Sequence, residues 1–180
     1  AKRHKVTVID DSTRLTPGFV PATLVLAVKP QVMDDVVPAY ASYAGLETVF
    51  LSIAAGKTMA YFEDKLGPEA AIVRAMPNTP AAVGRGITVA IANQRVGEAQ
   101  QNRCNSLLEA VGEVAWIDDE GLMDAVTAVS GSGPAYVFLL AEYLARAGEE
   151  AGLSASLSHQ LARATVSGAG EFLYRASEQA

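Results

Sequence analysis

Short apolar runs alternate with amphipathic stretches along the first two thirds of the chain. Residues 24–28 are apolar at successive positions, which is typical of a strand buried on both faces of a sheet. The stretches 32–44, 59–66 and 97–111 instead have the spacing of helices with one apolar face. Strands that alternate with helices indicate βαβ units and a mainly parallel sheet. We predict strands at residues 5–10, 23–28, 48–53, 71–75, 87–92 and 114–117.

The pattern changes near residue 119, after which no further strand is predicted. Leu122, Val126 and Val129 share one helical face, and a second apolar face follows from Leu139 onward. Two helices have a thin core, so we expect this part to bury its apolar faces against a partner subunit. The predicted organisation is an α/β domain at residues 1–118 and an all-α unit at residues 119–180.

Composition narrows the class of protein. The chain has 180 residues, of which 50 % are hydrophobic, and a net charge of −6, which is typical of a folded domain. The acidic helical part makes a nucleic-acid partner unfavourable, and no apolar run is long enough to span a membrane. A single cysteine, Cys104, favours a reducing compartment, so we expect a cytoplasmic protein. With only His4 and His159 beside that thiol, we expect no metal site.

Several common catalytic motifs are absent. No Gly-x-Gly-x-x-Gly segment follows a predicted strand. Gly56-Lys57-Thr58 has the end of a phosphate-binding P-loop, but the required earlier glycine is replaced by Leu51. Ser130-Gly131-Ser132-Gly133 has a serine where a hydrolase nucleophile elbow needs its first glycine. These absences exclude a P-loop enzyme and a serine hydrolase.

Three other segments have residues that suit ligand binding. Lys29 and Pro30 follow a strand, at the end where parallel sheets bind ligands, so Lys29 is either an anion ligand or a solvated lysine. Asn78 lies between two prolines and can both donate and accept hydrogen bonds, which suits a carboxamide or a rigid turn. Residues 130–133 interrupt a helical pattern, which either exposes N–H groups to a carboxylate or allows two helices to cross closely.

These segments, in this order, resemble the pyrroline-5-carboxylate reductase family. The most specific matches are Met-Pro-Asn-Thr-Pro at residues 76–80 and Ser-Gly-Ser-Gly-Pro-Ala-Tyr at residues 130–136. The resemblance extends from about Val20 to the end of the chain. The further matching segments are residues 26–31, 51–56 and 116–120.

The resemblance implies a partial Rossmann-like dinucleotide-binding domain followed by a truncated helical dimerisation and substrate domain. In this family NADPH or NADH transfers a hydride to the C=N bond of 1-pyrroline-5-carboxylate, and L-proline is formed. The protein would act as a homodimer or higher oligomer, without nucleic acid or membrane. The resemblance implies a dinucleotide cleft lined by Ala27, Lys29 and Pro30, with Lys29 as the catalytic candidate, a nicotinamide site at Ala54, Ala55 and Asn78, and a substrate site at Ser130, Gly131, Ser132 and Gly133.

Some features of the family have no counterpart in these residues. They lack its opening strand with the Gly-rich loop and its later Ser-Pro-Gly-Gly-Thr-Thr substrate loop. Residues 5–10 resemble the family's third strand, or alternatively its second, with Asp10 or Asp11 on the ribose. The chain is then either a piece of a longer reductase or a remnant that acts as a dimerisation module. A related imine or β-hydroxyacid dehydrogenase is a further alternative, although residues 118–180 lack the lysine those enzymes use as an acid.

Overall fold

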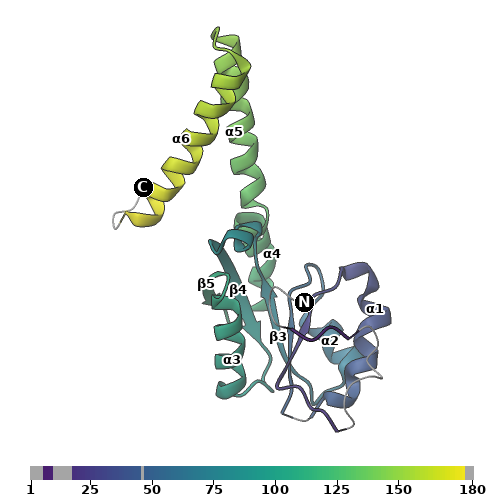
Figure 1. Ribbon diagram of the computed structural model, residues 1–180. Coiled ribbons are helices and arrows are strands. Elements are labelled where there is room, and N and C mark those ends of the chain that lie inside the picture. The colour runs from purple at the N-terminus through teal and green to yellow at the C-terminus, as the bar shows by residue number, and fades with distance from the viewer. Residues whose placement is uncertain (1–5, 10–17, 46, 177–180) are drawn as a thin grey trace. The chain divides into compact units, whose positions relative to one another are not determined.

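A five-stranded sheet forms the centre of the α/β part in the computed structural model, which describes residues 6–9, 18–45 and 47–176 (Figure 1). The strands follow one another across the sheet in chain order. The first three are parallel, with Leu24 opposite Phe50 and Phe50 opposite Ile72. The strands are β1 (Thr23–Leu26), β2 (Val49–Ser52), β3 (Ala71–Met76), β4 (Gly86–Ala92) and β5 (Gly112–Trp116).

The chain reverses direction once, between β3 and β4. The Asn93 N–H, just after β4, donates to the Ile72 carbonyl at the start of β3 (3.0 Å), so these strands are antiparallel. β5 runs with β4, because the Gly86 N–H donates to the Val111 carbonyl and the Ile117 N–H donates to the Ala90 carbonyl. The sheet is therefore mainly parallel, which confirms the predicted fold class.

Both faces of β2 and β3 are buried, as their continuous apolar sequences predict. The same prediction is wrong for β1, where Val25 is 49 % exposed. Phe50 and Ile72 pack with Phe62 on one face of the sheet. Val49 and Leu51 pack with Cys104 on the other face. The covering helices are α1 (Met33–Val36) and α2 (Met59–Leu66) on the first face and α3 (Glu98–Glu109) on the second.

Two predicted elements differ from the structure. The helix predicted at 32–44 is broken into the short α1 and two 3-10 segments, Pro30–Val32 and Val37–Tyr43. Pro38 lies in the first turn of the second segment and lacks the N–H that a continuous α-helix would need.

The strand predicted at 5–10 is also wrong where the structure describes it. Residues 6–9 form no strand, and the side chains of Val6 and Val8 are 57 % and 71 % exposed. A β-strand is stabilised by backbone hydrogen bonds to a neighbour, and residues 6–9 make none to the other residues that the structure describes. Lys5, Asp10 and Asp11 lie outside the described residues, so the predicted ribose contact has no structural description.

The chain divides into two compact units. The first comprises Ala1–Ala75, Val89–Ala110 and Val114–Glu120, and the second comprises Met76–Thr88, Val111–Glu113 and Gly121–Ala180. The segment that carries Asn78 thus belongs to the same unit as the C-terminal helices. The domain boundary at residue 118 stays a prediction.

The helical part of the second unit consists of α4 (Met123–Val126), a π-helical turn (Thr127–Gly131), α5 (Gly133–Glu150) and α6 (Ala155–Arg175). The helices α5 and α6 form a hairpin (Figure 1), and the Ser154 hydroxyl begins α6 by accepting the Leu157 N–H. Gly148 allows the two helices to approach, because a Cβ there would lie 2.8 Å from Ser158 Oγ.

Large apolar side chains remain exposed along α5. Tyr136 is 61 % exposed, Phe138 65 %, Leu140 53 % and Tyr143 55 %. Tyr136, Leu140 and Tyr143 lie on one face of the helix, and exposed apolar side chains gathered in this way mark an interaction site. Among the residues that the structure describes, no helix has the length and apolar character needed to cross a membrane.

Candidate functional site

The first unit brings five of the predicted site residues to one edge of the sheet. Ala27, Lys29 and Pro30 follow β1, while Ala54 and Ala55 follow β2. Because β1 and β2 are parallel, their carboxyl ends lie side by side, and the Ile53 N–H donates to the Leu26 carbonyl there (3.3 Å). Lys29 is exposed and in an extended conformation. This edge is where open α/β sheets bind their ligands.

A cluster of polar side chains joins the segments that follow β1 and β2. Lys57 Nζ lies 3.4 Å from Asp34 Oδ2 and 4.0 Å from the centre of the Tyr61 ring. The pKa of Asp34 is lowered by the Tyr61 hydroxyl and, to a smaller extent, by Lys57. The pKa of Tyr61 is raised to about 12, mainly by burial and then by Asp34. The cluster fixes α1 relative to the Ala54–Ala55 segment. Sequence analysis considered Lys57 only as part of a P-loop and missed this role.

A second ion pair anchors the start of α2. Arg74 on β3 is 11 % exposed, and its Nη1 lies 2.5 Å from Glu120 Oε1. The same carboxylate oxygen accepts a hydrogen bond from the N–H of Met59, the first residue of α2 (2.7 Å). Glu120 therefore satisfies a helix N-terminus and a buried guanidinium at once. Sequence analysis assigned no role to either charged residue.

The second unit brings Asn78 together with two residues of the Ser130–Gly133 segment. Asn78, Ser130 and Gly133 line a cavity of about 400 Å³. Its other lining residues are the apolar Pro80, Ile87, Val129, Pro134, Val137 and Phe138. No charged side chain is among the described residues that line it.

Gly131 and Ser132 do not line this cavity. Gly131 instead packs closely on the Met-Pro-Asn segment, since a Cβ at this position would lie 2.6 Å from Met76 Cε. The Ser132 N–H donates to the Thr127 carbonyl (2.8 Å), five residues earlier, in the π-helical turn. Such turns are frequent at functional sites. The two motifs that seemed independent in the sequence are thus packed against each other.

The hydrogen bonds of Asn78 leave one polar group available. Its Oδ1 accepts the Ile87 N–H (3.0 Å), which identifies the other side-chain atom as the amide nitrogen. The Ile87 N–H thus uses one of the two lone pairs of Asn78 Oδ1. The Nδ2 group remains as a donor for a ligand. Ser130 Oγ is buried and has no hydrogen-bond partner among the described residues.

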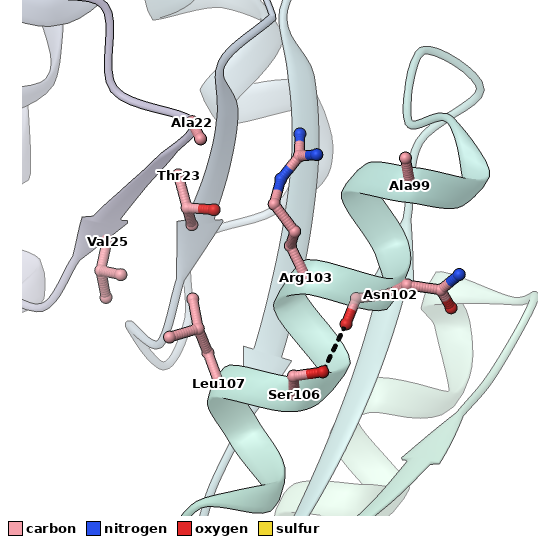
Figure 2. Close-up of a pocket in the computed structure, with 8 residues that line it drawn as sticks. All are labelled: Ala22, Thr23, Val25, Ala99, Asn102, Arg103, Ser106 and Leu107. Atoms are coloured by element: carbon pink, nitrogen blue, oxygen red, sulfur yellow. Dashed lines mark hydrogen bonds between the residues drawn. The ribbon is translucent and has the colours of Figure 1, made fainter.

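A larger cavity, of about 690 Å³, lies elsewhere in the first unit, between β1 and α3. Figure 2 shows its lining side chains, among them Val25, Arg103 and Leu107. It also contacts Ala22 and Thr23 at the amino end of β1, away from the carboxyl edge that carries Lys29. None of the predicted site residues lines it, so it is not part of the candidate site.

The fold defines a class of protein: a Rossmann-like, mainly parallel α/β sheet followed by an all-α part. The described residues contain no group of three or more His, Cys, Asp or Glu side chains that could hold a metal ion. Comparisons with known proteins agree with this class. The family model described as pyrroline-5-carboxylate reductase dimerisation matches residues 120–180. The chain belongs to the pyrroline-5-carboxylate reductase family.

Individual relatives extend the similarity over most of the chain. The pyrroline-5-carboxylate reductase of Pseudomonas aeruginosa is 47 % identical over 148 residues, which are 82 % of this chain and 54 % of that protein. The reductase of Synechocystis is 44 % identical over 177 residues, which are 98 % of this chain and 64 % of that protein. The chain thus spans between about half and two thirds of the length of these relatives.

Solved structures are similar in fold and sequence. A pyrroline-5-carboxylate reductase from Coxiella burnetii has a TM-score of 0.81 and 38 % identity, over 88 % of this chain and 59 % of that one. A Plasmodium falciparum pyrroline carboxylate reductase, solved with NADP bound, has a TM-score of 0.77 and 34 % identity, over 87 % of this chain and 59 % of that one.

Proposed function

We propose that the chain takes part in the NADPH- or NADH-dependent reduction of 1-pyrroline-5-carboxylate to L-proline. The observation that supports the proposal is that Asn78 and Ser130, from the two most specific segments of the resemblance, line the same cavity. The names of the relatives favour this reaction over a related imine or β-hydroxyacid dehydrogenase. We place the reaction in the cytoplasm, which suits a buried free thiol at Cys104.

The candidate site fits a nicotinamide dinucleotide. The exposed ammonium of Lys29 can pair with a phosphate at the carboxyl edge of β1 and β2. In the second unit the mostly apolar cavity that Asn78 lines suits an aromatic ring that carries a polar substituent. The neighbour from Plasmodium falciparum was solved with NADP bound, which supports the same ligand class here.

The bound cofactor would supply a hydride to the carbon of the protonated C=N bond of the substrate. A protonated imine is already a good hydride acceptor, so the chain needs little acid–base chemistry and mainly positions the reactants. At the carboxyl edge of β1 and β2, Lys29 would hold a phosphate of the cofactor.

We further propose that the protein acts as a homodimer or a larger oligomer. The exposed apolar side chains of α5 would be covered by a second copy. Gly168 and Gly170 on α6 have no atom within 4 Å of an added Cβ, which leaves room for a helix of the partner. The description of the matching family model, a dimerisation domain, supports this assembly.

A steady-state assay of NADPH oxidation by the purified protein, dependent on 1-pyrroline-5-carboxylate, tests the proposal. Lys29→Ala should raise the KM for the cofactor about tenfold, the effect of losing one charge-assisted hydrogen bond of about 1.4 kcal/mol. Lys65→Ala, which removes an ammonium group from the last turn of α2, is the matched control and should keep the parent KM. A folded oligomer without any activity would instead indicate a dimerisation module.

A further inference from the structure

The segment between β2 and α2 is held at both ends by polar contacts. Ser52, the last residue of β2, is fully buried, and its Oγ accepts the Ala54 N–H (3.2 Å). At the other end the Met59 N–H donates to Glu120 Oε1 (2.7 Å). The turn between these anchors is mostly exposed and contains Gly56, whose φ is +74°. The position of the turn therefore depends on what its own side chains contact.

Lys57 supplies the side-chain contacts of this turn. Its Nζ lies 3.4 Å from Asp34 Oδ2 on α1 and 4.0 Å from the centre of the Tyr61 ring on α2. The Lys57 side chain is only 18 % exposed, whereas that of Asp34 is 61 % exposed. α1 follows Lys29 after a single 3-10 turn, and Lys57 itself follows Ala54 by three residues. The ion pair thus connects the two segments that carry the predicted cofactor residues of the first unit.

We propose that Lys57 is a positioning residue for the cofactor, because its ion pair with Asp34 sets the spacing of the two segments between which the dinucleotide binds. Neither member of the pair touches the cofactor. A site that is already ordered in the free protein binds more tightly, since less conformational freedom is lost on binding. This inference rests on the proposed function and adds two residues to which the resemblance assigns no role.

The test measures the equilibrium binding of NADPH to the purified protein, by fluorescence titration without substrate. Lys57→Met keeps most of the apolar stem and removes the ammonium, and it should raise the Kd about fivefold, the effect of losing one partly exposed ion pair. Asp34→Asn removes the partner carboxylate and should raise the Kd by a similar factor. The double variant should bind no more weakly than either single variant, because both changes break the same contact.

The direction of the Asp34→Asn effect separates positioning from a simple charge effect. NADPH is an anion, so electrostatics alone would make binding tighter after loss of a carboxylate and weaker after loss of an ammonium. Positioning instead predicts that both changes weaken binding. Lys57→Arg retains the positive charge beside Asp34 and the Tyr61 ring, and it should bind NADPH within about twofold of the parent. Lys65→Met removes an ammonium from the last turn of α2 and is the matched control, which should bind like the parent.

Different results would overturn different statements. If Lys57→Met weakens binding while Asp34→Asn leaves it unchanged or tightens it, Lys57 acts through its charge and the positioning role is wrong. The role is also wrong if neither variant changes the Kd, if the two effects multiply in the double variant, or if Lys57→Arg binds as weakly as Lys57→Met. In each of these cases the proposed function stands, provided that the parent reduces 1-pyrroline-5-carboxylate. If the folded parent binds neither NADPH nor NADH, both the inference and the proposed function are wrong.

Discussion

Removal of the Glu120 carboxylate should destabilise the α/β part of the protein far more than removal of an exposed carboxylate. Glu120→Ala takes away the partner of Arg74, whose side chain is only 11 % exposed, and the acceptor of the Met59 N–H. Both groups would remain partly shielded from water. The perturbation thus combines an unpaired buried charge with the loss of a helix cap.

The magnitude follows from the burial of the two partners. Removing one member of a buried ion pair costs about 3–5 kcal/mol. Glu120 itself is 32 % exposed, so solvent reaches the pair and the lower end of that range applies. Including the lost cap, we expect a loss of about 3 kcal/mol in the free energy of unfolding. Glu120→Gln keeps an oxygen for the Met59 N–H and should cost about half as much.

Urea denaturation followed by circular dichroism measures this loss as a shift of the midpoint at unchanged slope. Glu69→Ala is the matched control, because Glu69 pairs with Arg95 and the two side chains are 62 % and 51 % exposed. It should cost less than about 0.5 kcal/mol. Equal losses for Glu120→Ala and Glu69→Ala would refute the argument that burial makes the first pair important.

Three further outcomes are expected. Gly112→Ala should prevent stable folding, because the φ of this residue is +147° and a Cβ would lie 1.9 Å from a backbone oxygen. Gly67→Ala, at φ +94° in open space, should lower the free energy of unfolding by only about 1–2 kcal/mol, measured by urea denaturation. Burial raises the pKa of the Cys104 thiol to about 11, so a thiol reagent at pH 8 should react only after unfolding. Stability should fall as pH rises from about 9 toward 11, and Cys104→Ala should remove the part of that slope below pH 10, where Tyr61 does not yet contribute. Replacing Tyr136 and Leu140, which lie one turn apart on α5, with serine should convert the oligomer to monomers in sedimentation velocity, and a variant that remains oligomeric would place the interface elsewhere.

The strands were predictable because their sequences are apolar on both faces. Residues 71–75 contain four apolar residues, and Val49 and Phe50 point to opposite faces, each of which is covered by helices in the structure. Residues 6–9 have the same composition without becoming a strand, since composition does not specify whether a hydrogen-bonding neighbour exists. Local pattern therefore predicts the capacity to form a strand, and tertiary pairing decides whether the strand forms.

Some contacts of the candidate site could be predicted from the sequence, and others could not. The Lys29 and Ala54 segments could be placed together, because both follow parallel strands that end at one edge. The contact of Glu120 with Met59 could not be predicted, as 61 residues separate them and neither has a distinctive local pattern. The orphaned hydroxyl of Ser130 was equally invisible, because satisfaction of a polar group depends on what the folded chain brings near it.

We propose that the protein transfers a hydride from a nicotinamide cofactor to the C=N bond of 1-pyrroline-5-carboxylate. The most direct measurement follows a label: NADPH deuterated at the transferring position of C4 is incubated with the substrate and the purified protein, and the proline formed is examined by NMR and mass spectrometry. The account predicts L-proline with one deuterium at C5. Unlabelled proline, or no proline from a protein that is folded and oligomeric, would contradict it.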